Sequence, residues 1–316
     1  MSFQINNPSF SNSINIEYPE SGVSYCVSFW KMNYFRRMQT NGKVKLVATD
    51  LDGTFLKNDQ TISQKNLESL HLMGENGITR VAATGRNLQK TREVISSNIP
   101  FDYIVFSSGA GVFDWRTGEL LYSQNIPAET VNGLSEYLIR NQWSFHLFKP
   151  VPENHYCWYF RSKNVTPEFE QYFKFHNSFA EPFPDCTAVN SEACQFLVIM
   201  PNDIAIFEQL KENICRTFPD LKIVRTSSPL HTPYIWMEIF HEDVSKGNGV
   251  KFICEKEQIN PACTMGIGND YNDLELLEFT RFSYLVENSP EELKRRFSVT
   301  KSNEENAFSV SVSIHL

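Results

Sequence analysis

Short apolar segments alternate with longer amphipathic segments along much of the chain. Residues 43–50, 77–85 and 101–109 are three such apolar segments, and each ends in polar or small residues. Between the first two, apolar residues recur at helical spacing after a capping serine, Ser63. This order predicts a β-α-β unit.

The same alternation resumes in the last quarter of the chain. A further helix is predicted where Ser289 is followed by Pro290, with Glu292 completing a capping box. Apolar strands that alternate with helices are typical of a parallel sheet covered on both faces, so we expect an α/β fold with a Rossmann-like core and helices on both faces. The other elements predicted here are helix 244–259, strand 263–268, helix 272–279 and strand 282–287.

The segment 126–238 breaks this rhythm. Aromatic-rich stretches such as "WSFHLF", "NHYCWYF" and "YIWMEIF" are interleaved with two amphipathic stretches, 128–141 and 203–218. Aromatic alternation is typical of a sheet packed against helices, so we expect these residues to serve packing. The alternative is a substrate pocket lined by Tyr156, Trp158, Tyr159 and Trp236. The pattern predicts an inserted α+β cap domain.

The predicted boundaries divide the chain into three parts. Residues 1–40 are rich in Asn and Ser and lack periodicity, so we expect a tail. The alternative is that translation starts at Met32 or Met38. Residues 41–125 and 239–316 form the predicted catalytic core domain. The insert 126–238 is the predicted cap, which we expect to set substrate specificity.

Composition and charge narrow the class of protein. No apolar run approaches the length of about 18 residues that a membrane span needs. The net charge of -8 argues against a broad nucleic-acid surface, since phosphate backbones are bound by clustered Lys and Arg. Seven cysteines without a C-x-x-C pair favour a reducing cytoplasm over a disulfide framework or a cysteine zinc site. We expect no nucleic-acid or membrane partner, and the sequence predicts neither a protein partner nor an oligomeric state.

Polar side chains gather at the ends of the predicted strands. Ligands of open parallel sheets bind beyond the carboxyl ends of the strands, so these side chains are candidates for one site. A lysine at a helix start joins them, because its ammonium and the helix dipole both favour an anion. The candidates are Asp50, Asp52, Thr84, Lys246, Asn269, Asp270, Asn272 and Asp273.

This set of side chains suits phosphoryl transfer. A carboxylate can attack phosphorus and form an aspartyl-phosphate, which divides one difficult displacement into two easier ones. Because the attack brings two anions together, it needs Mg²⁺ and a lysine to offset charge, and hydroxyl or amide donors for the phosphate oxygens. A second carboxylate two residues further along an extended chain lies on the same side and can protonate the leaving oxygen.

Four short motifs, in order, give the chain a family resemblance. They are "DLDGT" at 50–54, "ATGR" at 83–86, "VSKG" at 244–247 and "GNDYND" at 268–273. They resemble the four motifs of haloacid dehalogenase superfamily phosphatases, and the large insert between the second and third resembles the Cof-type group. The resemblance covers nearly everything after residue 41. It implies a Mg²⁺-dependent phosphatase of a small phosphorylated metabolite, with a sugar phosphate as the expected substrate.

The resemblance also implies a role for each motif residue. Asp50 is the expected nucleophile and Asp52 the expected general acid and base, and both are expected to give oxygen ligands to Mg²⁺. Arg86 is assigned either to phosphate and substrate or to a structural ion pair. The residues expected to bind phosphate are Thr84, Gly85, Lys246 and Asn272.

The chain departs from the family pattern at Asn269 and at Ser108. The fourth motif of the pattern runs G-D-x-x-N-D, so its usual metal-binding acid falls on Asn269, and Ser108 stands where the pattern has Asn. An amide oxygen can still bind Mg²⁺, a hard cation that keeps several waters and often needs only one or two carboxylates. We predict Asn269 as a direct ligand, with Asp273 supporting the metal through bound water; direct ligation by Asp270 is the alternative.

Two other functions are consistent with the same residues. A phosphomutase uses a similar pair of aspartates to move a phosphoryl group between positions of a sugar. The other is a non-catalytic metabolite-binding or regulatory protein of this fold. The residue that favours it is Asn269, which stands in place of the usual metal-binding acid. Taken singly, a strand-end Asp or a lysine at a helix start is an ordinary turn, cap or surface residue. Their joint placement favours catalysis.

Overall fold

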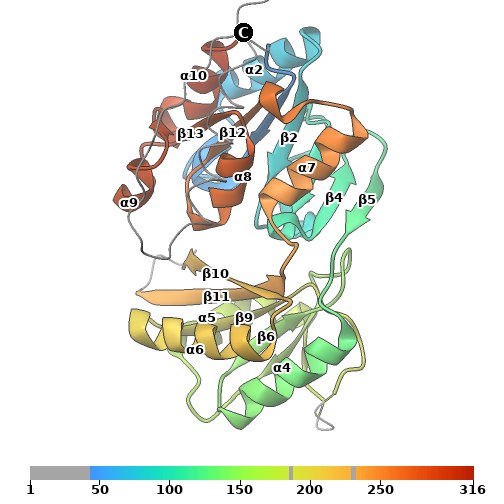
Figure 1. Ribbon diagram of the computed structural model, residues 1–316, viewed down its shortest axis with the longest axis vertical. Coiled ribbons are helices and arrows are strands. Elements are labelled where there is room, and N and C mark those ends of the chain that lie inside the picture. Colours follow the sequence, from blue (N-terminus) through green and yellow to red (C-terminus); the bar gives the residue numbers. More distant parts are fainter. Residues whose placement is uncertain (1–42, 185–187, 229–232) are drawn as a thin grey trace, which may run out of the picture. The chain divides into compact units, whose positions relative to one another are not determined.

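A computed structural model describes residues 43–184, 188–228 and 233–316 of the protein. The tail predicted for residues 1–40 lies outside the described residues. Helices and strands follow one another along the chain, and the strands form two sheets (Figure 1). No helix in the described ranges is both long enough and apolar enough to cross a membrane.

The larger sheet has eight strands in the order β14-β13-β12-β1-β2-β3-β4-β5. The strands from β14 to β3 pair in parallel. β1 reads Leu-Val-Ala-Thr and is buried throughout, as expected for a central strand covered on both faces. The strand bounds are β1 Leu46–Thr49, β2 Thr79–Ala83, β3 Tyr103–Phe106, β4 Gly111–Asp114, β5 Glu119–Ser123, β12 Thr264–Gly268, β13 Phe282–Leu285 and β14 Ser298–Val299.

Helices cover both faces of this sheet, which confirms the predicted α/β class. Val47 and Ile104 face a buried cluster that includes residues of α2 and α10, while Leu46 and Val105 face one that includes residues of α7 and α8. α2 begins after Ser63, whose side chain accepts a backbone hydrogen bond as predicted. The helix bounds are α2 Gln64–Glu75, α3 Leu88–Val94, α7 Lys246–Lys256, α8 Leu274–Phe279, α9 Glu291–Lys294 and α10 Ala307–Ser313.

Two local features differ from what the sequence predicts. One edge of the sheet is antiparallel, because β3, β4 and β5 follow one another as neighbours and reverse direction at each turn. At the other end of the chain, α9 begins after Pro290 with no side-chain cap, so the capping box predicted for Ser289 and Glu292 is wrong. Ser289 is buried instead, and its hydroxyl has no partner among the described residues.

A second sheet of six strands is inserted between β5 and α7, in the order β10-β11-β9-β6-β7-β8. Its neighbouring strands are antiparallel, apart from the parallel pair of β7 and β8. This is the predicted α+β insert; its last strand runs three residues beyond residue 238, and the domain boundaries stay a prediction. The strand bounds are β6 Phe145–Phe148, β7 Cys157–Phe160, β8 Ala180–Pro182, β9 Gln195–Pro201, β10 Leu221–Ser227 and β11 Tyr234–His241.

Helices pack on both faces of the second sheet. α4 (Ala128–Arg140) and α6 (Ile204–Thr217) pack against one face, where Ile235 and Met237 of β11 are buried with them. Trp236 points to the other face, where α5 (Pro167–His176) lies and the Tyr172 ring is 4.9 Å from the Trp236 ring. Trp236 and Phe240 on this second face belong to the same buried cluster as Phe106 of the larger sheet, and Tyr172 of α5 packs against that cluster.

Candidate active site

Asp50 stands directly after β1, at the carboxyl end of the central strand. Its backbone amide donates to the Ile267 carbonyl of β12 at 2.9 Å, which fixes Asp50 between two strands. The next residues form a single turn, Leu51–Phe55, in which Gly53 takes a φ of +69°. A left-handed conformation costs a residue with a side chain about 1–2 kcal/mol. Glycine therefore suits this tight exit from the strand.

Lys246, the first residue of α7, joins two carboxylates. Its Nζ donates to Asp50 Oδ1 at 2.7 Å and to Asp273 Oδ1 at 2.6 Å, and Asn272 Oδ1 lies 3.4 Å away. The side chains of Lys246 and Asp273 are fully buried, and that of Asp50 is 6% exposed. A buried ammonium is tolerated where carboxylates neutralise it. The structure thus unites residues of the first, third and fourth motifs.

Asp273 also shapes the turn that carries the fourth motif. Its Oδ2 accepts from the backbone amides of Asn269 at 2.8 Å and Asp270 at 3.1 Å. Asp270 accepts from the Tyr271 amide at 2.8 Å, and this capping box closes the short helix Tyr271–Asp273. Both oxygens of Asp273 therefore have protein donors. Its support of a metal through water stays a prediction, and so does the alternative of Asp270 as a ligand.

Burial changes the acid–base properties of this cluster. It raises the pKa of Asp50 to about 7; the Lys246 ammonium opposes this shift, while Asp273 and Asp52 add to it. Burial lowers the pKa of Lys246, but attraction by Asp273 and Asp50 outweighs this effect and the net shift is upward. The lysine therefore stays charged between the two carboxylates.

The second motif follows β2 at the neighbouring strand end. Thr84 is fully buried, and its Oγ1 accepts the backbone amide two residues along at 3.1 Å. A Cβ placed on Gly85 would lie 3.4 Å from Asn272 Nδ2 and 3.6 Å from Ser108 Oγ. Gly85, Asn272 and Ser108 therefore lie close together. The residues predicted to bind phosphate are grouped at one edge of the sheet, and their role stays a prediction.

Asn269 lies against the turn after Asp50. A Cβ on Gly53 would come within 2.7 Å of Asn269 Nδ2, so glycine is what leaves room for this side chain. Asn288 also reaches the turn and donates to the Gly53 carbonyl at 2.8 Å. The amide of Asn269 thus lies beside the first motif, where a metal ligand is predicted. Within the described ranges, no group of three His, Cys, Asp or Glu side chains is arranged to hold a metal ion.

Asp52, which is 48% exposed, pairs with Arg86. Arg86 Nε and Nη2 each donate to one Asp52 oxygen at 2.7 Å. This bidentate arrangement fixes the carboxylate in orientation as well as in position. Of the two roles that the sequence leaves open for Arg86, the structure shows the ion pair, and its partner is the expected general acid. The two residues are 34 positions apart, and no sequence signal links them.

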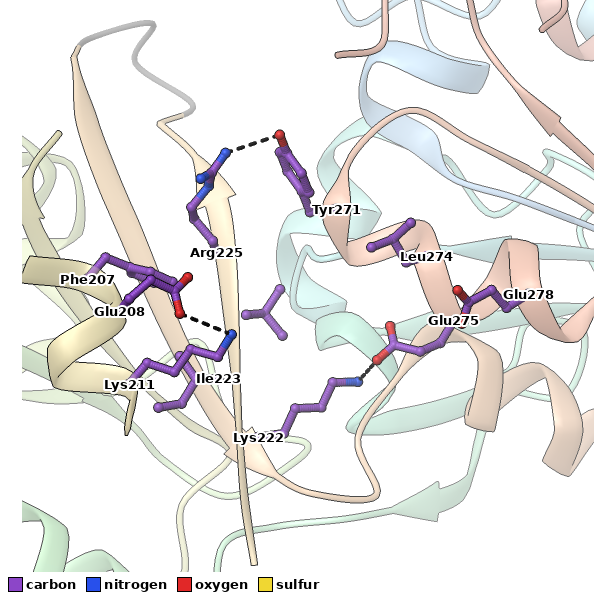
Figure 2. A pocket seen from close by; sticks show the side chains of 11 residues that line it. Phe207, Glu208, Lys211, Lys222, Ile223, Arg225, Tyr271, Leu274, Glu275 and Glu278 are labelled. Atoms are coloured by element: carbon purple, nitrogen blue, oxygen red, sulfur yellow. Dashed lines mark hydrogen bonds and ion pairs between the residues drawn. The ribbon is translucent and has the colours of Figure 1, made fainter. Parts of the chain in front are cut away.

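A strand of the inserted domain contacts the fourth motif. Arg225 of β10 donates to the Tyr271 hydroxyl at 3.1 Å, and its guanidinium lies 4.7 Å from the centre of the Tyr271 ring. Lys222 of the same strand pairs with Glu275 of α8 (Figure 2). Figure 2 shows a pocket between these contacts. Its lining includes Tyr271 but none of the catalytic candidates of the first and third motifs, so it is a neighbouring surface pocket.

A comparison with protein families agrees with this geometry. The sequence pattern of the haloacid dehalogenase-like hydrolases matches residues 47–310. Because the match spans most of the chain, the protein belongs to the haloacid dehalogenase-like hydrolases. The resemblance found in the four motifs is thereby confirmed.

Named relatives include phosphatases. The provisionally named phosphatase YxeH of Bacillus subtilis is 26% identical over 283 residues, which are 86% of this chain and 97% of that protein. An HMP-PP phosphatase of Yersinia pestis is 34% identical over 109 residues, which are 33% of this chain and 38% of that protein. Family and relatives together confirm the predicted enzyme class, the phosphoric monoester hydrolases.

Solved structures share the fold, including the inserted domain. BT1666 of Bacteroides thetaiotaomicron, a phosphatase of the same superfamily, superposes with a TM-score of 0.72 at 19% identity and covers 88% of this chain and 97% of its own. The subclass IIB sugar phosphatase BT4131 gives a TM-score of 0.68 at 19% identity, over 86% of this chain and 98% of its own. At this identity the likeness establishes the fold.

Proposed function

We propose that this protein is a Mg²⁺-dependent phosphatase that hydrolyses a small phosphorylated metabolite, with a sugar phosphate as the expected substrate. The observation that carries the proposal is the buried Lys246 ammonium held between Asp50 and Asp273 at the carboxyl edge of a parallel sheet. A cation at that edge is where an anionic ligand is expected. The similarity to the sugar phosphatase BT4131 supports the substrate class. We also propose a cytoplasmic location, which the seven cysteines without a C-x-x-C pair favour.

The residues supply the groups for two successive displacements. Lys246 donates to Asp50 Oδ1, and we assign Asp50 Oδ2 to the attack on phosphorus. Asp52 protonates the leaving oxygen as its bond to phosphorus breaks. Asp52 then takes a proton from the water that hydrolyses the aspartyl-phosphate and releases inorganic phosphate. The Thr84 hydroxyl and the amides of Gly85 and Asn272 donate to the phosphate oxygens.

The donors at this sheet edge fit a magnesium ion. Mg²⁺ prefers oxygen ligands, and the Asp50 carboxylate, the Asp52 carbonyl and the Asn269 amide oxygen would hold it. Burial raises the pKa of Asp50 to about 7, and the neighbouring Asp273 and Asp52 add to this shift; a further cation at this place would favour the ionised carboxylate. When bound, Mg²⁺ offsets the negative charge of the phosphate.

A substrate screen tests the proposed function. The purified protein is offered sugar phosphates and other phosphate monoesters, and released inorganic phosphate is measured with Mg²⁺ and with a chelator. We expect release that depends on Mg²⁺. Transfer of the phosphoryl group to another position of the sugar would identify a phosphomutase instead, and binding without turnover a metabolite-binding protein.

Asn269→Asp should tighten magnesium binding, because the substitution adds a negative charge beside the first motif. We expect the dissociation constant for Mg²⁺, measured by calorimetry on the protein alone, to fall by about tenfold. The concentration of Mg²⁺ that gives half-maximal phosphate release should fall with it. An unchanged affinity would contradict the assignment of Asn269 as a ligand.

Two neighbouring substitutions serve as comparisons for that measurement. Asp270→Asn should change the Mg²⁺ affinity little, and Asp273→Asn should weaken it. A large loss of Mg²⁺ affinity in Asp270→Asn alone would identify Asp270, and not Asn269, as the metal ligand.

Arg86→Ala should impair turnover most where the leaving group is poor, because Arg86 holds the carboxylate of Asp52. We expect kcat for an alkyl phosphate to fall by about tenfold to a hundredfold, and kcat for an activated aryl phosphate, which needs little protonation, to fall much less. Arg86→Lys keeps the charge and should recover part of the loss. Equal losses on both substrates would show that Arg86 acts on phosphate binding or on the fold.

A further inference from the structure

Arg225 is a residue of the inserted domain whose polar partners lie outside that domain. It stands in β10, at the edge of the six-stranded sheet. Its Nη2 donates to the Tyr271 hydroxyl at 3.1 Å and lies 3.9 Å from Glu292 Oε1 of α9. The guanidinium is 4.7 Å from the centre of the Tyr271 ring, which is within the range of a cation–π interaction. Arg225 therefore contacts Tyr271 in two ways (Figure 2).

Tyr271 stands in the middle of the turn that carries the fourth motif. Asn269, the expected metal ligand, is two residues before it, and Asn272, which is expected to bind phosphate, follows it directly. The Tyr271 ring also packs against a buried apolar cluster, which includes Leu277, Leu285 and Leu293. The ring is therefore held both by the catalytic core and by β10, and any shift of the ring acts on residues on either side of it.

The backbone of this turn is held largely by side-chain acceptors. The amides of Asn269 and Asp270 donate to the Asp273 carboxylate, and the Tyr271 amide donates to the Asp270 carboxylate. The Asp273 amide donates to the Asp270 carbonyl at 3.0 Å and closes a single helical turn. Such a segment opens locally at a lower free energy than the strands of a sheet. A contact to the Tyr271 ring from outside the turn should therefore add to its order.

A second residue of β10 keeps the strand in place beside the turn. Lys222 Nζ donates at 3.0 Å to the carbonyl of Val244, in the connection that leads to Lys246, and it pairs with Glu275 of α8. These contacts remain when Arg225 is replaced. Because the Arg225 side chain is also 34% exposed, its truncation should release the turn without detaching the strand or unfolding the protein.

We propose that Arg225 is a positioning residue, which holds the fourth-motif turn in its binding geometry through Tyr271. The inserted domain then contributes to Mg²⁺ and phosphate binding through a residue that need not touch either ligand. This inference rests on the proposed function, because that proposal assigns Asn269 to the metal and Asn272 to the phosphate. Coupling of two binding events is reciprocal, so Mg²⁺ at the turn should also strengthen the attachment of β10.

Hydrogen exchange tests the positioning in the absence of any ligand. In Arg225→Ala, the amides of residues 269–273 should exchange about threefold to tenfold faster than in the wild type, as expected for the loss of a cation–π contact and a hydrogen bond. Exchange in β1 should stay unchanged. Lys211→Ala is the matched control, because Lys211 lines the same pocket but pairs with Glu208 of its own helix. Unchanged exchange of the turn in Arg225→Ala would overturn the proposal.

Magnesium binding tests the consequence for the site. Calorimetry on the protein alone should give a Kd for Mg²⁺ about threefold to tenfold higher in Arg225→Ala, and the wild-type value in Lys211→Ala. Added Mg²⁺ should slow exchange in β10 of the wild type but not of Arg225→Ala, which a purely structural role would not produce. An unchanged Kd, or no slowing in a wild type that binds Mg²⁺, would overturn the proposal. A wild type that neither binds Mg²⁺ nor releases phosphate would instead refute the proposed function, and exchange of the turn would still decide the role of Arg225.

Two further variants test whether Arg225 acts through Tyr271. Arg225→Lys keeps a cation beside the ring and should recover part of the lost Mg²⁺ affinity. Tyr271→Leu removes both the ring and its hydroxyl, so adding Arg225→Ala to it should change neither the exchange of the turn nor the Kd for Mg²⁺ any further. Additive losses in the double variant would show that Arg225 acts by another route and would overturn the proposal.

Discussion

Asp50→Asn is expected to abolish phosphate release and to leave the fold intact. An amide cannot attack phosphorus, so turnover should fall by about a thousandfold or more. The fold should persist because the amide is close in size to the carboxylate and Lys246 keeps its ion pair with Asp273. Phosphate release is measured on a preparation free of host phosphatases, with the thermal midpoint of unfolding as the check of structure.

An exposed aspartate provides the matched control for this experiment. Asp59 lies on the surface in the turn before α2, and Asp59→Asn removes a carboxylate of the same kind without touching the site. We expect wild-type turnover from the control. Activity of Asp50→Asn above about a tenth of the wild-type value would contradict the nucleophile assignment, since removal of a nucleophile costs far more than this.

Lys246→Met should cause the largest loss of stability among the motif residues, together with loss of turnover. The substitution leaves the Asp50 and Asp273 carboxylates buried without their cation. Breaking a buried ion pair by removing one partner costs about 3–5 kcal/mol. Because Asp273 also holds the turn of the fourth motif, that turn should lose order as well. Chemical denaturation at constant pH measures the change in the free energy of unfolding.

The same helix supplies the control for Lys246→Met. Lys251 is an exposed residue of α7, and Lys251→Met should change the free energy of unfolding by less than about 0.5 kcal/mol. Adding Asp273→Asn to Lys246→Met removes one of the stranded charges and should recover part of the lost stability. If Lys246→Met is as stable as Lys251→Met, the buried ion pairs do not stabilise the fold.

The catalytic core could be predicted from the sequence because its signals are local. Apolar strands that are buried on both faces read as short continuous runs, and the polar residue that ends each run marks the carboxyl edge of the sheet. For this reason Asp50 and Thr84 could be assigned to one place before any contact was known. Lys246 could be added to them because it stands at a helix start, where an anion is favoured. The antiparallel pairing of β4 and β5 could not be predicted, because a short apolar run does not indicate in which direction the adjacent strand runs.

The partners of the charged residues could not be predicted in the same way. Arg86 meets Asp52, and Arg225 meets Tyr271, only after the two sheets have folded, since these pairs join different elements. The capping box predicted at Ser289 is wrong for a similar reason. Tertiary packing buries Ser289, and the local sequence pattern gives no sign of this burial. The helix propensity of the residues indicates that a helix forms, whereas tertiary packing determines at which residues the helix begins and ends.

The connection between β11 and α7 limits how this enzyme could be recombined with its relatives. Four residues separate His241, the last residue of β11, from Lys246. Exchange of inserted domains between family members is an obvious route to new specificity, and it requires a joint in this connection. A joint at residue 238 would divide β11 and leave Phe240 with the recipient, whereas a joint after Lys246 would transplant the catalytic cation. A chimera should therefore be joined between residues 242 and 245. The length of this connection should be kept, because an inserted or deleted residue would shift α7, and with it Lys246, relative to Asp50.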